Sequence, residues 1–563
     1  MYLKKYIDRD EHVKKLINIL FVISGVVLTF LMSLNYALYI SYDGFIYSGD
    51  YKVQLPYALL AVIIMLVTYI YLCQKRNFVL ETLGAASAYS FYFSCFMSVC
   101  IFLQLVQDTE RNLSHILQAF NAPANALSSS DSIHIAVGLV CLLTILCIVV
   151  FTNYVVNLIL FWFLKFIKKS SKYDKVFFYV ALFACLSIIC YFHARTRGIW
   201  DSLDLVYQTD ATFVYHNYYP VFSYSLDFDY DIGVGGIRHP LATMMTYPIF
   251  VIVSVMANIF FWIPNIQAIL YAVVQSILMI LSVIMIKRII NSNWIYLMFI
   301  LSFPFIFFSF FIEKYPIAVF FIVLYVYSTV WERNENVQKY SLIAAGGMTI
   351  TSAFLGLLYG KEKQLKKRLL EYNSAVMLFI LTLIGTGRIH YILDFYRLLN
   401  QNSKVFYEGV IEELGFTVKD RIFGYTNLFA ASFIPLKYRA TDLNFQWISL
   451  VDKVNYFGLI ILLVVAYASG RYIKDKRIFP FIFWFFYSVF QFLIIGFGTN
   501  CEVLFTWYFA WSFIPLFVLG LNDLIKNIKV RNLIYAGLLF IMFYKNYIHS
   551  KDLLAYLMYK API

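Results

Sequence analysis

The stretch that decides the fold is IQAILYAVVQSILMILSVIMIKR, residues 266–288. No charge interrupts residues 266–286, and Lys287-Arg288 ends the run. A helix that crosses a hydrocarbon core about 30 Å thick needs ~20 mostly apolar residues in succession. We therefore predict that 266–286 spans a membrane. The positive-inside rule then places Lys287-Arg288 on the cytoplasmic face.

The composition of the whole chain agrees with this reading. Of 563 residues, 61% are hydrophobic and only 14% are charged, which is more apolar surface than a soluble protein of this length could bury. The net charge of +13 comes from short basic clusters between apolar runs, a pattern typical of cytoplasmic loops rather than of nucleic-acid binding. We predict an all-α, polytopic integral membrane protein with roughly 11–13 transmembrane helices.

The apolar runs divide the chain into three parts. Residues 1–170 form an N-terminal membrane unit of four helices with few charges inside the apolar runs. Residues 171–398 form a membrane core that contains an acidic external loop, 195–239. Residues 399–563 hold most of a second external loop, 392–453, and the C-terminal membrane helices.

Two apolar stretches leave the topology open. Residues 240–262 contain prolines and either cross the membrane or lie re-entrant. If they are re-entrant, which we prefer, Glu313 reaches the same face as the acidic loop; if they cross, Glu313 is cytoplasmic. The preferred reading requires residues 341–358, rich in Gly, Ser and Thr, to enter and leave on one side, as a broken helix could.

The acidic loop carries the densest group of chemically active side chains. It reads RTRGIWDSLDLVYQTDATFVYHNYYPVFSYSLDFDYDIGVGGIRH and holds six aspartates together with arginines and histidines. Sugar transfer from a lipid-linked phosphate needs a carboxylate as general base for the acceptor hydroxyl, and positive charge for the departing phosphate. A loop held at the membrane surface would suit a donor whose lipid tail stays in the bilayer.

The order of these features resembles the GT-C superfamily of membrane glycosyltransferases, in particular relatives of the protein mannosyltransferases and aminoarabinose transferases. The shared order is an external loop with an early aspartate, then Arg238-His239-Pro240-Leu241, then Glu313-Lys314-Tyr315-Pro316. The resemblance covers about residues 176–400. It implies inverting transfer of a sugar from a polyprenyl-phosphate donor to a glycan, lipid or protein acceptor. No Asp-Glu or Asp-Asp pair opens the loop, so dependence on a divalent metal, Mg²⁺ or Mn²⁺, stays open.

The resemblance also assigns expected roles. Asp210 best matches the catalytic carboxylate, with Asp204 and Asp201 as competitors, and Glu313 matches the second acid. Each has a plainer reading, because an aspartate at a membrane surface is more often a solvated residue or a helix cap. The expected substrate-binding residues are Arg238, His239, His216, Lys314 and Glu502.

Other classes of protein remain as alternatives. A transporter or flippase for a lipid-linked glycan or other anionic substrate is the main one, although transporters commonly place charges at the bilayer midplane and show repeated halves. A polysaccharide polymerase or ligase and a non-enzymatic scaffold are further alternatives. The Lys-, Ile-, Phe- and Tyr-rich residue usage fits a bacterium of low GC content. We expect an integral protein of the bacterial plasma membrane, with its active site on the extracytoplasmic face.

Overall fold

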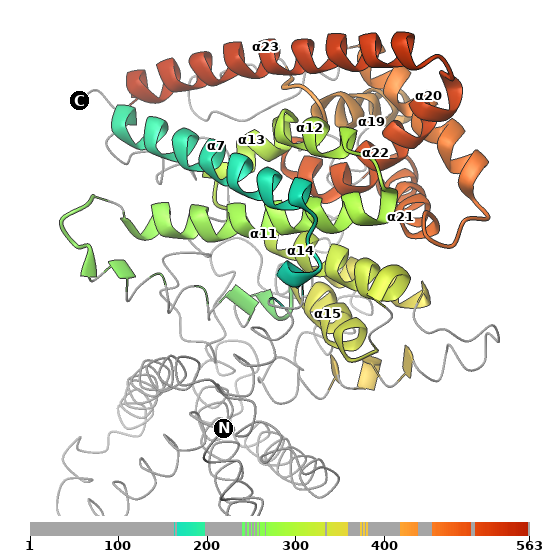
Figure 1. The fold of residues 1–563 in the computed structure, drawn as a ribbon, viewed down its shortest axis with the longest axis horizontal. Helices are drawn as coiled ribbons and strands as arrows, with labels where there is room; N and C mark the ends of the chain where they lie inside the picture. The colour runs from blue at the N-terminus through green and yellow to red at the C-terminus, as the bar shows by residue number, and fades with distance from the viewer. Residues whose placement is uncertain are drawn as a thin grey trace, which may run out of the picture. The chain divides into compact units, whose positions relative to one another are not determined.

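The computed structural model describes residues 166–196, 239–242, 259–264, 266–332, 335–358, 417–436, 453–496 and 502–560, with residue 163 and short pieces of 245–257 and 372–380. Contacts divide the chain into two compact units, of which the first holds Met1–Ser170 and two short later segments. Almost all the described residues belong to the second unit. Within these ranges every element is helical and no strand occurs (Figure 1).

The first helices of this unit run back and forth along one another. Helix α7 (Lys172–Thr196) is antiparallel to α11 (Ile266–Ile290), because Asp174 near the beginning of α7 contacts Arg288 near the end of α11. Helices α12 (Trp294–Ile300) and α13 (Phe303–Phe310) then return along α11. Ser302 separates them, and its hydroxyl oxygen accepts the N–H of Phe305 as the N-cap of α13.

The next segment contains a broken helix. Helix α14 (Tyr315–Tyr327) and the π-helical turn η4 (Ser328–Glu332) lead to α15 (Glu335–Met348), which packs against α14. After Met348 the chain turns back as the 3₁₀ helix η5 (Ile350–Leu358). The Ser352 hydroxyl donates to the Ala345 carbonyl at 3.0 Å, so η5 folds against α15 as a hairpin. The break expected within 341–358 is therefore present.

The C-terminal helices pack around α22. They are α19 (Val418–Ala431), α20 (Tyr456–Tyr472), α21 (Phe479–Val489), the π-helical η7 (Phe490–Ile495), α22 (Glu502–Leu524) and α23 (Ile528–Lys560). Helix α22 contacts α14, α19, α20 and α21. Helix α19 falls within 392–453, the stretch predicted as an external loop, and its residues 424–431 are buried against the other helices. The approach of α20 to α19 is so close that a Cβ at Gly458 would overlap the Thr426 carbonyl.

Four described helical segments are long and apolar enough to cross a membrane: Lys172–Thr196, Ile266–Ile290, Tyr315–Glu332 and Val503–Leu524. They are compatible with an integral membrane protein, while the larger helix count stays a prediction. The predicted helices before residue 163, most of 240–262 and the stretch 381–416 lie outside the described residues.

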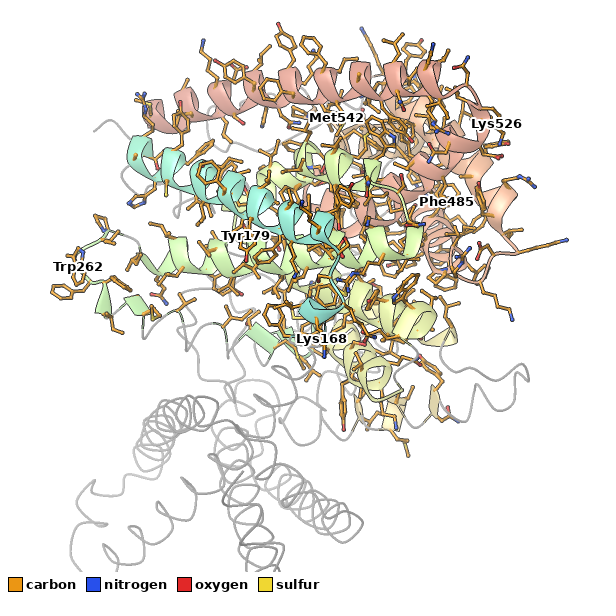
Figure 2. All side chains as sticks on the ribbon, in the orientation of Figure 1. Lys168, Tyr179, Trp262, Phe485, Lys526 and Met542 are labelled. Atoms are coloured by element: carbon orange, nitrogen blue, oxygen red, sulfur yellow. The ribbon has the colours of Figure 1, made fainter. Side chains whose placement is uncertain are left out.

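The two ends of this helical unit differ in charge. At one end, which we call the basic end, the Trp294 ring stacks on Tyr535 at 4.3 Å, and Tyr535 donates to the Val518 carbonyl. Charged residues gather there: Lys287, Arg288, Arg471, Asp523 and Lys526. Figure 2 shows Lys526 at this end and Trp262, which precedes α11, at the other. Trp262 is 63% exposed, as expected for an aromatic residue at a membrane interface.

Candidate functional site

Two carboxylates are buried among the described residues, Glu313 and Asp174. Glu313 is 1% exposed and lies in the turn between α13 and α14, away from the basic end. Burying a carboxylate is costly unless hydrogen bonds or opposite charges compensate for the lost hydration. The partners of each acid therefore indicate what each one does.

The Glu313 turn is held from outside by α11. The Gln275 side-chain amide donates to the carbonyls of Phe308 at 2.6 Å and Phe311 at 2.7 Å. Its oxygen accepts the Glu313 N–H at 3.1 Å. The Glu313 carboxylate accepts the Lys314 N–H at 3.1 Å, which places negative charge at the N-terminus of α14, where the helix dipole favours it.

The ring of Tyr315 connects this turn to two other parts of the fold, the segment that begins at His239 and helix α22. Its centroid lies 6.4 Å from the His239 ring, 5.4 Å from the Phe505 ring and 5.5 Å from the Tyr508 ring. Phe505 is in the first turn of α22, so Tyr315 brings His239 and the beginning of α22 to the first turn of α14. We call this region the Glu313 end of the bundle.

The tip of the α15–η5 hairpin completes the Glu313 end. His239 Nδ1 lies 2.6 Å from the Met348 carbonyl oxygen, and the Leu241 N–H donates to the Gly347 carbonyl at 2.8 Å. Beyond the tip, the Thr351 hydroxyl is 3.0 Å from the Tyr508 hydroxyl. The entry to the 240–262 stretch is thus bonded to the broken helix and contacts the α14 turn through Tyr315.

Two buried hydroxyl groups near this end have no hydrogen-bond partner among the described residues. The Tyr271 hydroxyl, on the same helix as Gln275, is fully buried, and the Thr349 hydroxyl lies at the hairpin tip. A buried polar group without a partner costs about 1–3 kcal/mol. Such groups are candidates for contacts with a bound substrate.

Both flanks of the acidic loop lie at the Glu313 end. Before the loop, Phe192 stacks on Phe310 at 4.2 Å and α7 ends at Thr196. After the loop comes His239, whose ring contacts Tyr315. The predicted residues within the loop lie outside the described residues: Asp201, Asp204, Asp210, His216 and Arg238.

The structure thus brings together part of the predicted site. His239, Glu313 and the backbone of Lys314 are at one end of the bundle, and α22 begins there with Glu502, whose side chain is outside the described residues. Sequence reasoning missed Gln275, Tyr315 and Tyr508. A Gln-Ser pair inside an otherwise apolar run was the available signal for Gln275, because buried amides in membrane helices need partners.

The second buried acid forms a different kind of site, also missed from the sequence. Asp174 accepts hydrogen bonds from Arg288 at 3.0 Å and from the Tyr296 hydroxyl at 2.7 Å, and Lys287 Nζ lies 3.4 Å away. Arg288 also donates to the Tyr327 hydroxyl at 3.2 Å. We call these five residues the Asp174 cluster. It joins α7, α11, α12 and α14 at the basic end and neutralises its own acid.

Within the described ranges, no group of three His, Cys, Asp or Glu side chains could hold a metal ion. Nothing matches this chain among known family models, curated proteins or solved structures. The function is therefore argued from the residues at the Glu313 end.

Proposed function

We propose that this chain is a membrane glycosyltransferase that moves a sugar from a polyprenyl-phosphate-linked donor to an acceptor outside the cytoplasm. The observation that supports it is the gathering of His239, buried Glu313 and both flanks of the aspartate-rich loop at one end of an apolar helical unit. Charges concentrate at the opposite end, which the positive-inside rule assigns to the cytoplasm. The proposed active site then faces the extracytoplasmic side.

The proposed reaction is a direct displacement. The acceptor oxygen forms a bond to the anomeric carbon, the bond from that carbon to the lipid phosphate oxygen breaks, and polyprenyl phosphate leaves with the electron pair. The acceptor proton passes to a loop carboxylate, for which Asp210 is our candidate. Arg238 and His239 neutralise the departing phosphate, and Glu313, as the second acid, orients the acceptor.

The test is a transfer assay with purified full-length protein in lipid vesicles. A panel of polyprenyl-phosphate sugars would be supplied with and without Mg²⁺ or Mn²⁺, and release of polyprenyl phosphate measured. We expect release with one donor class, reduced about 100-fold or more by Asp210→Asn and by Glu313→Gln. Asp475→Asn, in the exposed turn after α20, is the matched control and should leave the rate unchanged. An absence of release with every donor, from folded protein, would contradict the proposal.

A transporter or flippase is the second candidate, favoured by one specific observation. Broken helices near the bilayer midplane often form the substrate sites of transporters, and α15 breaks at Thr349 beside His239. The same vesicles distinguish the two candidates. Movement of a labelled lipid-linked glycan between leaflets without cleavage would support the transporter, whereas cleavage of the sugar–phosphate bond would support the transferase.

A further inference from the structure

Gln275 lies on α11 within the apolar run AVVQSILM and is fully buried. An amide among apolar side chains is unfavourable unless each donor and acceptor finds a partner. Here both N–H groups of the amide and its oxygen are engaged, and all three partners are backbone groups of the segment 308–313. The backbone of that segment therefore satisfies every hydrogen-bonding group of the Gln275 amide.

Those partners lie where the backbone leaves its helical path. Phe311 is extended, with φ −78° and ψ 121°, so α13 ends before it and the carbonyls of Phe308 and Phe311 accept from Gln275. The Glu313 N–H finds its acceptor in the same amide. Since carbonyls can only accept and an N–H can only donate, the amide fits in one orientation, and this orientation fixes the backbone of Glu313.

We infer that Gln275 is a positioning residue for Glu313, holding the turn so that the Glu313 carboxylate stays at the N-terminus of α14 beside Tyr315. The inference rests on the proposed function, in which Glu313 takes part in the transfer. It assigns to α11 a role in the chemistry through backbone contacts alone. A displacement of an active group by about 1 Å can lower a rate about 100-fold.

The adjacent residue supplies a matched control. Ser276 is also fully buried, and its hydroxyl donates to the Ser309 carbonyl at 3.1 Å. This bond joins the same two helices but ends on Ser309 within α13, whereas the Gln275 amide also contacts Phe311 and Glu313 beyond the helix. If Gln275 merely tied α11 to α13, removal of either bond would have similar consequences.

The experiment compares Gln275→Met, which keeps the length of the side chain without the amide, with Ser276→Ala. Transfer kinetics in vesicles should show kcat lowered about 10- to 100-fold by Gln275→Met, with a much smaller change in the donor KM, and little effect of Ser276→Ala. The second readout is carbodiimide labelling of Glu313 against pH, followed by mass spectrometry. Its midpoint should move in Gln275→Met and stay in Ser276→Ala.

Equal loss of kcat in the two variants, or an unmoved labelling midpoint in Gln275→Met, would overturn the inference. If the wild-type protein transfers no sugar, the proposed function fails, yet the labelling midpoint still shows whether Gln275 holds Glu313. Should Gln275→Met not fold, Gln275→Asn keeps the amide but cannot span the turn. Gln275→Asn should likewise lower kcat and move the labelling midpoint of Glu313. If it does neither, Gln275 is not a positioning residue.

Discussion

The two buried acids among the described residues lie in contrasting surroundings. Asp174 lies in a regular helix, and two basic residues of the Asp174 cluster, Arg288 and Lys287, neutralise its charge. Glu313 occupies a turn between helices, where Gln275 and the beginning of α14 hold its backbone. Irregular backbone also surrounds Glu313 at the hairpin tip and at His239, whereas the Asp174 cluster joins four helices.

The difference suggests a criterion for separating structural from functional buried charge. A cluster that supplies its own counter-charges in regular helices has no need of a ligand, and its removal should cost stability. Broken helices in a membrane are tolerated where they are buried in protein or line a site. An acid among such breaks, near the flanks of the aspartate-rich loop, is the better candidate for chemistry. The following predictions test this division.

The largest effect should come from breaking the Asp174 cluster. Asp174→Ala would leave Arg288 buried without its carboxylate, which for buried pairs costs about 3–5 kcal/mol. Thermal unfolding in detergent should show a much lower Tm, while transfer per folded molecule stays within about twofold. Replacing both partners, as in Asp174→Leu with Arg288→Met, should recover much of the loss.

The exposed pair at the end of α22 serves as the control for this prediction. Lys526 lies 2.6 Å from Asp523 with its own side chain 75% exposed, so Lys526→Met should change stability by less than about 1 kcal/mol. A loss from Asp174→Ala no larger than that would remove the structural role of the cluster.

Glu313→Gln should give the opposite profile. The amide keeps the volume of the side chain and can still accept the Lys314 N–H, so Tm should change little. The transfer rate should fall about 100-fold, as for loss of a catalytic carboxylate. The quantity to compare between Glu313→Gln and Asp174→Ala is the loss of transfer rate divided by the loss of stability. A large drop in Tm with no drop in rate per folded molecule would place Glu313 in the structural class as well.

The sequence predicted the long apolar helices well, because their boundaries follow from charge. The run 266–286, predicted to span a membrane, became α11, Ile266–Ile290. The break in 341–358 was required by the preferred topology, and the Gly, Ser and Thr residues of the stretch are compatible with it. These features are local, so composition and periodicity suffice.

The sequence could not predict which segments meet. Three features depend on tertiary packing: the kink at Ser302 between α12 and α13, the burial of α19, and the contact of His239 with the hairpin tip. Polar residues such as Gln275 signal that a partner exists without naming it. For the same reason, the sequence nominated Glu313 but gave no indication of the backbone contacts that hold it.

A smaller effect is expected at Gly347, where the hairpin tip meets the 239–242 segment. A Cβ at this position would lie 2.6 Å from the Leu241 Cβ, so Gly347→Ala should destabilise the tip by about 1–3 kcal/mol. The rate of sugar transfer should also fall, because the tip holds His239. Adding Leu241→Gly, which removes the Leu241 Cβ together with the side-chain carbons beyond it, should relieve the overlap, and a double-mutant cycle measures the coupling. Gly470→Ala, with open space around the new methyl group, should instead be neutral or stabilising. If Gly347→Ala and Gly470→Ala change stability and transfer rate equally, the close packing of the tip does not determine the transfer rate.

The smallest effect should appear at the beginning of α19, where Thr417 and Asp420 form a capping box. Thr417→Ala removes the cap and should cost about 1 kcal/mol. The hydrogen bonds from the side chain and the backbone N–H of Thr417 lower the pKa of the Asp420 carboxyl. A carboxyl with a lowered folded-state pKa stabilises the fold fully above its ordinary pKa near ~3.9 and loses that contribution as the pH falls through the lowered value. Because the variant lacks the side-chain bond, its Tm should fall less on acidification, and the gap between the two proteins should narrow below about pH 4. A gap that stays constant from neutral to acidic pH would show that the Asp420 charge contributes nothing to this cap.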